Sequence, residues 1–254
     1  MTTSDSAYSA FLARKALVDV PTGIPDPPAL SPRLKEHQSL LTRWALKRGR
    51  AAIFADTGLG KGWCILEWAR VVAEHTDKPV LILAPLAVSQ QFEREAAKLG
   101  TDVKIVASQS DVESPSDAFS GICVTNYQKL HKFDPTAFGG VACDEGSILK
   151  HLDGSTRKLL IESFRETPFK LSATATPSPN DHTELGGQAE FLGVMSHSEM
   201  LATFFVHDGS STQDWRLKGH AREAFWRWVC GWGAIVKHPS DLCQCECHSK
   251  RSVP

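Results

Sequence analysis

Short apolar runs alternate with amphipathic segments along most of the chain. The runs lie at 51–55, 80–84, 103–107, 122–125, 140–143 and 169–173. Runs of this length that lack polar alternation are typical of strands buried on both faces, and helical spacing separates them. The pattern therefore predicts an α/β fold in which a mainly parallel sheet lies between layers of helices.

The segments between and after these runs are expected to form the helices. Helical spacing is found at 34–47, from Lys61 onward, and at 88–99, 155–164, 181–192, 198–205 and 219–236. The last three segments follow one another and indicate a mostly helical C-terminal part. The prolines of residues 21–32 exclude a helix there and indicate an extended lead-in.

We divide the chain into four parts on this basis. Residues 1–32 form an N-terminal lead-in, 33–192 the α/β lobe, 193–241 a helical extension of that lobe, and 242–254 an irregular cysteine-rich tail. The tail contains Cys243, Cys245, Cys247 and His248. These are zinc-binding residue types, but their spacing is shorter than the paired C-x₂₋₄-C pattern of tetrahedral sites.

Composition narrows the choice of function. Lys and Arg number 28 against 29 for Asp and Glu, a net charge of −1, so any nucleic-acid binding must be local. There is no run of apolar residues long enough for a membrane span and no secretory signal. Scattered cysteines favour reduced thiols and a cytoplasmic location, without a membrane partner.

The chain is organised around residues 51–67, which read AAIFADTGLGKGWCILE. An apolar strand, a glycine-bearing turn and a helix that begins at Lys61 form an anion site, because N–H groups and the helix dipole point at the ligand. The lysine adds a full positive charge. This arrangement is typical of triphosphate binding, and the expected contacts come from Thr57, Gly58, Leu59, Gly60, Lys61 and Gly62.

This stretch departs twice from the G-x-x-x-x-G-K-[ST] pattern. Ala55 takes the first glycine position, which is a mild change, and Gly62 takes the Ser/Thr position. The second change removes the hydroxyl that normally binds Mg²⁺. We therefore expect Gly62→Thr to raise magnesium-dependent activity.

Two acids, Asp144 and Glu145, follow the apolar run 140–143 directly. Carboxylate and water oxygens are preferred ligands of Mg²⁺, and Asp144 is placed to bind the metal. Glu145 is placed to orient and deprotonate a water beside the γ-phosphate. The alternative is an acidic turn that caps the next helix.

Weaker signals accompany these two sites. A side-chain amide at Gln38 has the donor and acceptor that adenine recognition requires, although a glutamine on a helix is usually a surface residue. Residues 171–177 read LSATATP, a strand that ends in small hydroxyl residues. Such a run suits a relay between a phosphate site and a moving partner surface.

Two further strand ends are candidates for nucleic-acid contact. Residues 84–86 read APL and residues 125–127 read TNY. Small residues and N–H groups at strand ends bind backbone phosphates without many basic side chains. The candidates are Pro85, Thr125 and Asn126. Four tryptophans between 215 and 232 are interpreted as packing residues, with base stacking as the alternative.

Taken in order, these pieces resemble the first RecA-like lobe of superfamily-two helicases and translocases, of the DEAD/H-like and chromatin-remodeller type found in phages and prophages. The matching pieces are LKEHQ, ADTGLGKG, LAPL, VTNYQ, CDEGS and LSATATPSPND, between Leu34 and Asp241. The resemblance implies a three-layer RecA-like P-loop domain that binds ATP and Mg²⁺ and acts on DNA. It assigns adenine to Gln38, the phosphates to Lys61, and coupling of hydrolysis to DNA contact to Ser172 and Thr174.

The family also requires a second RecA-like lobe with arginine fingers. Nothing after Asp241 resembles one, so we expect a first lobe alone, completed by a second polypeptide, split or truncated. Such a lobe binds nucleotide weakly and does not unwind DNA alone. Gly62 keeps open a second hypothesis, a non-hydrolysing DNA- or partner-binding remnant. A third, an unrelated P-loop NTPase such as a nucleotide kinase, is opposed by Gln38 and the SAT-type motif.

Overall fold

The computed structural model describes residues 20–113, 121–146, 149, 154–178, 181–207 and 215–242. Nearly all of the predicted cysteine-rich tail, with its zinc-binding residue types, lies outside the described residues. So do the first nineteen residues of the lead-in. The described part of the lead-in, up to residue 32, contains no helix or strand, as its prolines predict.

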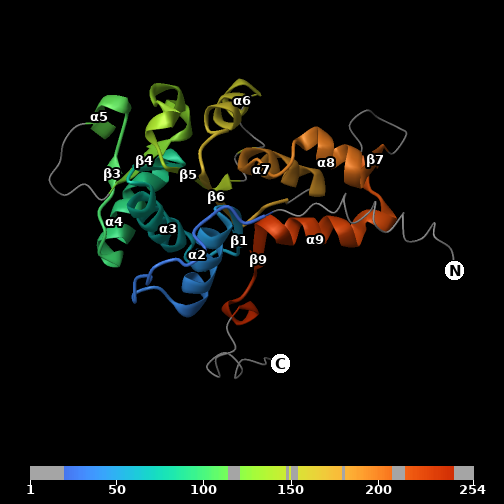
Figure 1. The fold of residues 1–254 in the computed structure, drawn as a ribbon, viewed down its shortest axis with the longest axis horizontal. Coiled ribbons are helices and arrows are strands. Elements are labelled where there is room, and N and C mark those ends of the chain that lie inside the picture. Colours follow the sequence, from blue (N-terminus) through green and yellow to red (C-terminus); the bar gives the residue numbers. More distant parts are fainter. Residues whose placement is uncertain are drawn as a thin grey trace.

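A seven-stranded sheet forms the centre of the molecule (Figure 1). Its strands are β1 (Arg50–Ala55), β2 (Val80–Ala84), β3 (Lys104–Ile105), β4 (Ile122–Asn126), β5 (Gly140–Asp144), β6 (Phe169–Thr174) and β9 (Gly233–Val236). The order is β3-β4-β2-β5-β6-β1-β9, and every pairing is parallel. The predicted parallel α/β fold is therefore confirmed, and the six predicted strands are present.

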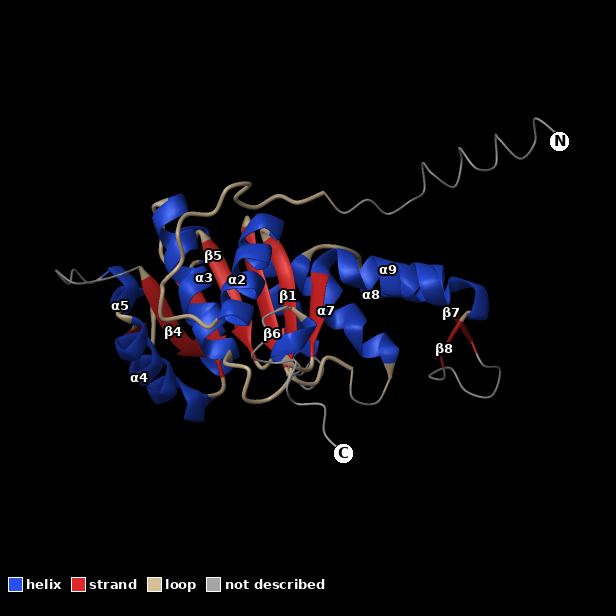
Figure 2. Cartoon of the chain, turned by 90° about the horizontal axis from the view of Figure 1, so that it is seen from below, coloured by secondary structure: helices blue, strands red, loops and turns tan. Residues whose placement is uncertain are grey.

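Helices cover both faces of the sheet, which gives the three layers seen in Figure 2. One face is covered by α2 (Glu36–Arg48), α3 (Lys61–Thr76) and α4 (Ser89–Leu99), and the other by α6 (Gly154–Ser163), α7 (Leu185–Leu192), α8 (His197–Phe204) and α9 (Arg222–Trp232). A short helix, α5 (Gln109–Glu113), lies near the β3 edge. Alternate strand residues point into the two cores, as a doubly covered sheet requires.

The prediction of a helix through residue 236 was wrong. Helix α9 ends at Trp232, and residues 233–236 form β9, an edge strand paired with β1. A Cβ at Gly233 would lie 2.8 Å from Cε2 of Phe54, so the glycine permits a close approach of the two strands. The apolar stripe of α9 continues into residues 233–236, and periodicity alone does not separate a buried strand from a helix.

The C-terminal part also contains a small hairpin that the sequence pattern did not predict. Strand β7 (Phe205–His207) pairs antiparallel with β8 (Trp215–Leu217). Phe205 was expected to end the preceding helix, but it begins this strand and is 3% exposed. The division of the chain at residue 193 stays a prediction.

The tryptophans of this part serve packing to different extents. Trp228 and Trp232 are buried, with ring centroids 5.3 Å apart, and Trp232 lies edge-on to Phe54 at 5.8 Å. Trp215 and Trp226 are partly buried, and the ring of Trp215 lies at 43° to that of His207 with the centroids 4.1 Å apart. The packing interpretation therefore holds for the two buried rings, which join α9 to the sheet.

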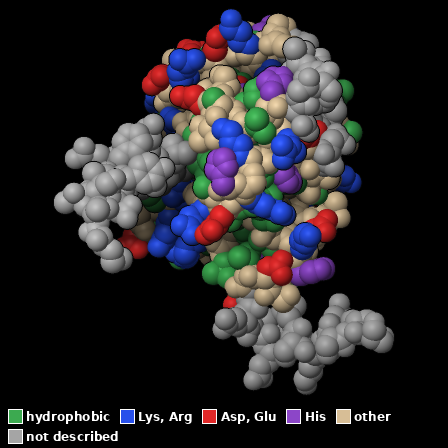
Figure 3. All heavy atoms as spheres, turned by 90° about the vertical axis from the view of Figure 1, so that its right-hand side faces the viewer, with side chains coloured by type: hydrophobic (Ala, Val, Ile, Leu, Met, Phe, Trp, Pro, Cys, Tyr) green, Lys and Arg blue, Asp and Glu red, His purple; other side chains and the backbone are tan. Residues whose placement is uncertain are grey.

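Charged side chains of both signs are interspersed on the face of the molecule that Figure 3 shows. This distribution agrees with a net charge of −1. Among the described residues, no helix combines the length and the apolar composition that crossing a bilayer requires.

Three buried thiols make alkaline sensitivity a testable property of this fold. Burial raises the pKa of Cys64, Cys123 and Cys143 to about 12. Above the ordinary thiol pKa, the unfolded chain releases these protons while the folded chain keeps them. The contribution of each buried thiol to the unfolding free energy is therefore complete below pH 9. It falls by about 1.4 kcal/mol per pH unit as the pH rises toward 12.

We expect Cys123→Ala to reduce the loss of unfolding free energy between pH 8 and pH 10 by about 1.4 kcal/mol. Urea unfolding at pH 8 and at pH 10 measures this difference. The destabilisation caused by the cavity that Cys123→Ala leaves is the same at both pH values and therefore cancels. Cys230→Ala is the matched control, because that thiol is exposed on α9. An equal alkaline loss in wild type and Cys123→Ala would contradict the assignment.

Candidate functional site

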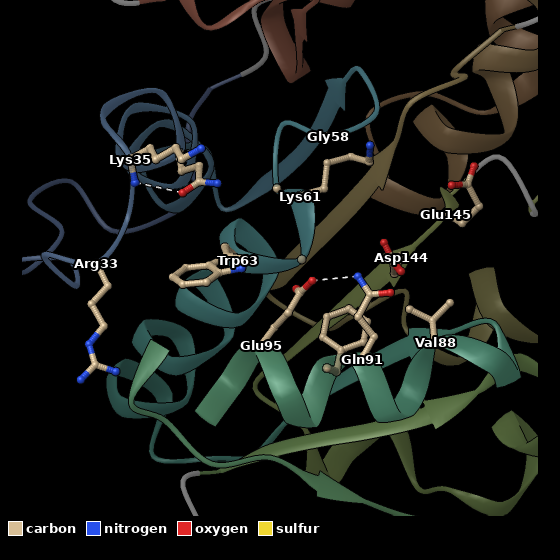
Figure 4. Close-up of a pocket in the computed structure, with 14 residues that line it drawn as sticks. Arg33, Lys35, Gly58, Lys61, Trp63, Val88, Gln91, Glu95, Asp144 and Glu145 are labelled. Carbon is tan, nitrogen blue, oxygen red and sulfur yellow. Dashed lines mark hydrogen bonds between the residues drawn. The ribbon is translucent and has the colours of Figure 1, made fainter. Parts of the chain in front are cut away.

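A cavity of about 590 Å³ opens at the carboxyl edge of the sheet, where β1 and β5 end (Figure 4). Its size lies in the usual range for small-molecule and cofactor sites. The lining residues come from the segment between the lead-in and α2, from α2, the loop after β1, α3, α4 with the residue before it, and the end of β5. They are Arg33, Lys35, Gln38, Gly58, Gly60, Lys61, Gly62, Trp63, Val88, Gln91, Phe92, Glu95, Asp144 and Glu145.

The loop between β1 and α3 forms one wall of this cavity. Asp56 N donates to the carbonyl of Val236 at 3.0 Å, so strand β9 holds the start of the loop. Gly60 precedes α3 with φ +77°, and a Cβ there would collide with Nε2 of Gln38. Glycine is therefore required at this turn. At the start of α3, Trp63 N already donates to the carbonyl of Gly60 at 3.1 Å. The N–H groups of Lys61 and Gly62 come before this bond, at the helix positions that suit an anion.

Lys61 lies at the start of α3 and faces this loop. Its Nζ donates to the carbonyl of Ala55 at 2.9 Å and to that of Asp56 at 3.3 Å. The side chain is partly buried and lines the cavity. A positive charge is thus held at the mouth of the loop by the loop's own carbonyl oxygens.

Gln38 is buried, at 5% exposure, rather than a surface residue of α2. Its Nε2 donates to the carbonyl of Leu59 at 3.1 Å, and its Oε1 accepts from Lys35 N at 2.9 Å. Nε2 of the neighbouring His37 also lies 3.2 Å from that carbonyl oxygen. Gln38 therefore connects α2 to the loop. Leu59 contributes its carbonyl to this contact, and Thr57 N donates to Oδ1 of Asp56 at 2.6 Å.

The acidic pair at the end of β5 is joined to the end of β6. Glu145 has a φ of +53°, a left-handed conformation that is uncommon for glutamate and concentrates at functional sites. Thr174 Oγ1 donates to Glu145 Oε1 at 2.9 Å. Ser172 is fully buried and instead donates to Oε1 of Gln188 on α7 at 2.9 Å. Of the two predicted coupling residues, Thr174 touches the acidic pair and Ser172 links the sheet to α7.

Electrostatics at the acidic pair favour a cation. Burial, followed by the negative charge of Glu145, raises the pKa of Asp144 to about 6, with a smaller contribution in the same direction from Glu95. Among the described residues, no three acidic, histidine or cysteine side chains are close enough together to hold a metal. The partly buried carboxylate of Asp144, with those of Glu145 and Glu95 lining the same cavity, nevertheless fits Mg²⁺. This cation takes its other ligands from water and phosphate.

The candidate nucleic-acid residues lie away from the cavity lining, at the ends of β2 and β4. Thr125 is 1% exposed and donates to the carbonyl of Val106 at 2.8 Å. Asn126 is 6% exposed and caps the turn after β4 by accepting from Lys129 N at 3.2 Å. Pro85 is partly exposed, and Leu86 beside it is 71% exposed. Nucleic-acid contact at these positions stays a prediction.

Sequence reasoning missed the face of α4 that lines the cavity. Gln91 and Glu95 of α4, with Val88 just before the helix, line the cavity, and Gln91 Nε2 donates to Glu95 Oε1 at 2.7 Å (Figure 4). The i, i+3, i+7 spacing of these residues was a usable signal, because it puts them on one helix face. Nothing in the sequence showed that this face lies over Gly62.

Comparison with known proteins agrees with this fold. The family model described as type III restriction enzyme, res subunit, matches residues 31–179. A chromatin-remodeling ATPase INO80 of Pyricularia oryzae is 28% identical over 220 residues, covering 74% of this chain and 11% of that protein. Putative protein p41 of Acyrthosiphon pisum secondary endosymbiont phage 1 is 24% identical, covering 62% of this chain and 38% of that protein. The chain thus spans well under two thirds of either relative.

Solved structures resemble the chain in fold. The Sulfolobus solfataricus SWI2/SNF2 ATPase core in complex with double-stranded DNA has a TM-score of 0.65 at 18% identity, covering 84% of this chain and 46% of that one. The UvsW helicase of bacteriophage T4 has a TM-score of 0.51 at 18% identity, covering 64% and 58%. These likenesses show that the chain has the RecA-like fold, a mainly parallel sheet with flanking helices, as predicted.

Proposed function

The chain belongs to the family of the type III restriction enzyme res subunit, and from this premise we propose that it is the ATP-binding first lobe of a DNA-dependent translocase or helicase. The observation that carries the proposal is the convergence of Lys61, Asp144 and Glu145 on one cavity at the carboxyl edge of a parallel sheet. Ligands of open α/β sheets bind at this edge. The cavity also has the volume that a nucleotide requires.

In this proposal the loop 56–60 and the first turn of α3 cradle the triphosphate. The N–H groups of the turn bind phosphate oxygens, and Lys61 Nζ leaves the loop carbonyls to bind the β- and γ-phosphates. Gln38 reads the adenine edge. The Gln38 amide already makes hydrogen bonds with Leu59 and Lys35. A movement of Gln38 on binding the base would therefore also shift the phosphate loop.

Asp144 is the residue we propose to hold Mg²⁺, directly or through water, and the metal supplies positive charge to the phosphates when bound. Glu145 accepts a proton from the attacking water and orients it. The bond from Thr174 Oγ1 fixes one carboxylate oxygen of Glu145. A shift of β6 would therefore move the proposed base Glu145 through Thr174. Ser172, on the same strand, connects β6 to α7 through its hydrogen bond to Gln188.

DNA and a second RecA-like lobe are the partners we propose. The Sulfolobus relative of similar fold was solved with double-stranded DNA. Hydrolysis in this fold class takes place between two lobes, whose closure brings arginine side chains to the phosphates. We therefore expect nucleotide binding by this lobe to be weak and its intrinsic turnover slow.

A second candidate function is a lobe that binds nucleotide or DNA without turnover. The observation that favours it is Gly62, which has no hydroxyl for the metal at the position where the motif requires Ser or Thr. Nucleotide binding with no turnover, in the presence of DNA as well as in its absence, would support this candidate.

Equilibrium binding of a fluorescent ATP analogue to the full chain tests the proposed function. We expect saturable binding with Mg²⁺ that unlabelled ATP displaces more effectively than GTP. A folded protein, shown by cooperative unfolding, that bound neither ATP nor its analogue would contradict the proposal. A DNA-stimulated ATPase assay on the same preparation then separates the hydrolysing lobe from the non-hydrolysing one.

Replacing Gln38 with alanine is expected to lower ATP affinity by about tenfold and to reduce the preference for ATP over GTP. The change removes the proposed adenine contact and the bond to Leu59. Competition binding with ATP and GTP measures both quantities. Gln90→Ala on α4 is the control, because Gln90 is exposed and does not line the cavity. An unchanged ATP/GTP ratio would show that Gln38 only supports the loop.

A further inference from the structure

The space beside Gly62 is occupied by a side chain from another helix. A Cβ placed on Gly62 would lie 3.2 Å from Cδ of Glu95 and in collision with its Oε2. Position 62 is where the phosphate-loop pattern has a serine or threonine. The carboxylate of Glu95 therefore fills the position from which the missing hydroxyl side chain would begin.

One oxygen of the Glu95 carboxylate makes a hydrogen bond within its own helix. Glu95 lies on α4, is partly buried, and accepts a hydrogen bond at Oε1 from Nε2 of Gln91 at 2.7 Å. Its other oxygen, Oε2, faces Gly62. The charged groups that line the same cavity include Lys61, Asp144 and Glu145. One carboxylate oxygen is thus committed to Gln91, and the second is presented to the start of α3.

We propose that Glu95 supplies, from α4, the oxygen toward Mg²⁺ that Gly62 lacks. A carboxylate oxygen is a stronger ligand for this hard cation than a neutral hydroxyl, and it acts either directly or through a bound water. The glycine is then a requirement of the arrangement, because any side chain at position 62 would displace Glu95. This inference deepens the proposed function and depends on it.

The inference changes what we expect of Gly62→Thr. A threonine at position 62 must push Glu95 aside before its hydroxyl reaches the metal position. Gly62→Thr alone therefore replaces the carboxylate oxygen of Glu95 with a hydroxyl oxygen. The magnesium dependence of nucleotide binding is then expected to stay close to that of wild type. We expect the hydroxyl to matter when Glu95 has been removed as well.

The experiment measures the affinity of the full chain for a fluorescent ATP analogue with Mg²⁺ and again with EDTA. The ratio of the two affinities is the magnesium gain. Mn²⁺ in place of Mg²⁺ allows electron paramagnetic resonance to report metal bound in the ternary complex, which does not require turnover. The variants are Glu95→Gln, Gly62→Thr and Gly62→Thr/Glu95→Ala, and Glu93→Gln is the control on the exposed face of α4.

We expect Glu95→Gln to lower the magnesium gain by about tenfold or more and to weaken Mn²⁺ binding in parallel. Gly62→Thr/Glu95→Ala is expected to recover most of that gain, whereas Glu93→Gln is expected to behave as wild type. Urea unfolding of each variant separates these effects from a loss of the folded state.

Two results would overturn the inference. The first is an unchanged magnesium gain in Glu95→Gln; if the affinity then rises equally with Mg²⁺ and with EDTA, Glu95 only repels phosphate. The second is a loss of gain that Gly62→Thr/Glu95→Ala does not recover, which would mean that Glu95 only shapes the cavity. Failure of the proposed function differs from both, because the wild-type chain would then bind no analogue in either condition.

Discussion

Lys61→Ala is expected to weaken binding of a fluorescent ATP analogue by about a hundredfold, equivalent to ~2.7 kcal/mol. The variant removes the full positive charge that we propose to act on the β- and γ-phosphates. Charge-assisted hydrogen bonds in a partly enclosed cavity are among the strongest that a side chain makes. Equilibrium titration with Mg²⁺ measures the affinity, and competition with unlabelled ATP shows that the signal comes from one site.

The control for Lys61→Ala must account for the contacts that Lys61 makes in the structure. Its Nζ donates to two backbone carbonyls, so the loop itself could lose order when the lysine is removed. Lys218→Ala is matched to it, because Lys218 Nζ also donates to two carbonyls, those of Ala202 at 2.9 Å and Thr203 at 3.0 Å. Lys218 lies outside the cavity lining. Equal affinity in wild type and Lys61→Ala would contradict the proposed phosphate contact.

The largest effect on stability is expected from Arg70→Ala, at about 3 kcal/mol of unfolding free energy. Glu67 has a side chain that is 0% exposed, and Arg70 pairs with it through Nη2 at 2.8 Å and Nε at 3.1 Å. Removing the arginine leaves a buried carboxylate whose remaining hydrogen bond comes from Ser31 N at 2.7 Å. The arginine side chain is 25% exposed, which keeps the estimate at the lower end of the range for buried pairs, about 3–5 kcal/mol.

Urea unfolding with Arg227→Ala as control measures this effect. Arg227 and Glu223 form a pair at 2.6 Å on α9, but their side chains are 80% and 82% exposed. Such a pair contributes about 1 kcal/mol or less. Glu67→Leu/Arg70→Met is expected to recover most of the stability, since the unpaired carboxylate is then absent. A similar small loss for Arg70→Ala and Arg227→Ala would show that the buried pair is not a major contribution.

The Glu67 pair also connects the stability of the lobe to its lead-in. The bond from Ser31 N holds the end of the lead-in against α3, two residues before Arg33 of the cavity lining. Arg33 in turn donates to the carbonyl of Lys98 at the end of α4. The end of the lead-in is therefore tied to α3 and the residues that follow it to α4, and we expect Arg70→Ala to weaken nucleotide binding in addition to stability.

The sequence by itself determined the alternation of strands and helices, the position of Lys61 at the start of a helix, and the positions of Asp144 and Glu145 at the end of a strand. These features are local, because the few residues of a continuous apolar run or of a glycine turn are enough to predict the conformation of that segment. The same reasoning failed at residues 233–236, where an apolar stripe at the end of α9 was taken for more helix. That segment is a strand because β1 offers it an edge, and an edge is not visible in the segment's own pattern.

The tertiary structure decided which of the distant motifs touch. Strand order β5-β6-β1 puts Thr174 between the phosphate loop and the acidic pair, so its hydroxyl reaches Glu145 across 29 positions in the chain. It also turned Gln38 inward to the loop and brought Glu95 over Gly62. Sequence order does not contain these contacts, because they follow from how strands are ordered and helices packed. Local chemistry thus predicted the parts of the candidate site, and packing decided how these parts are connected.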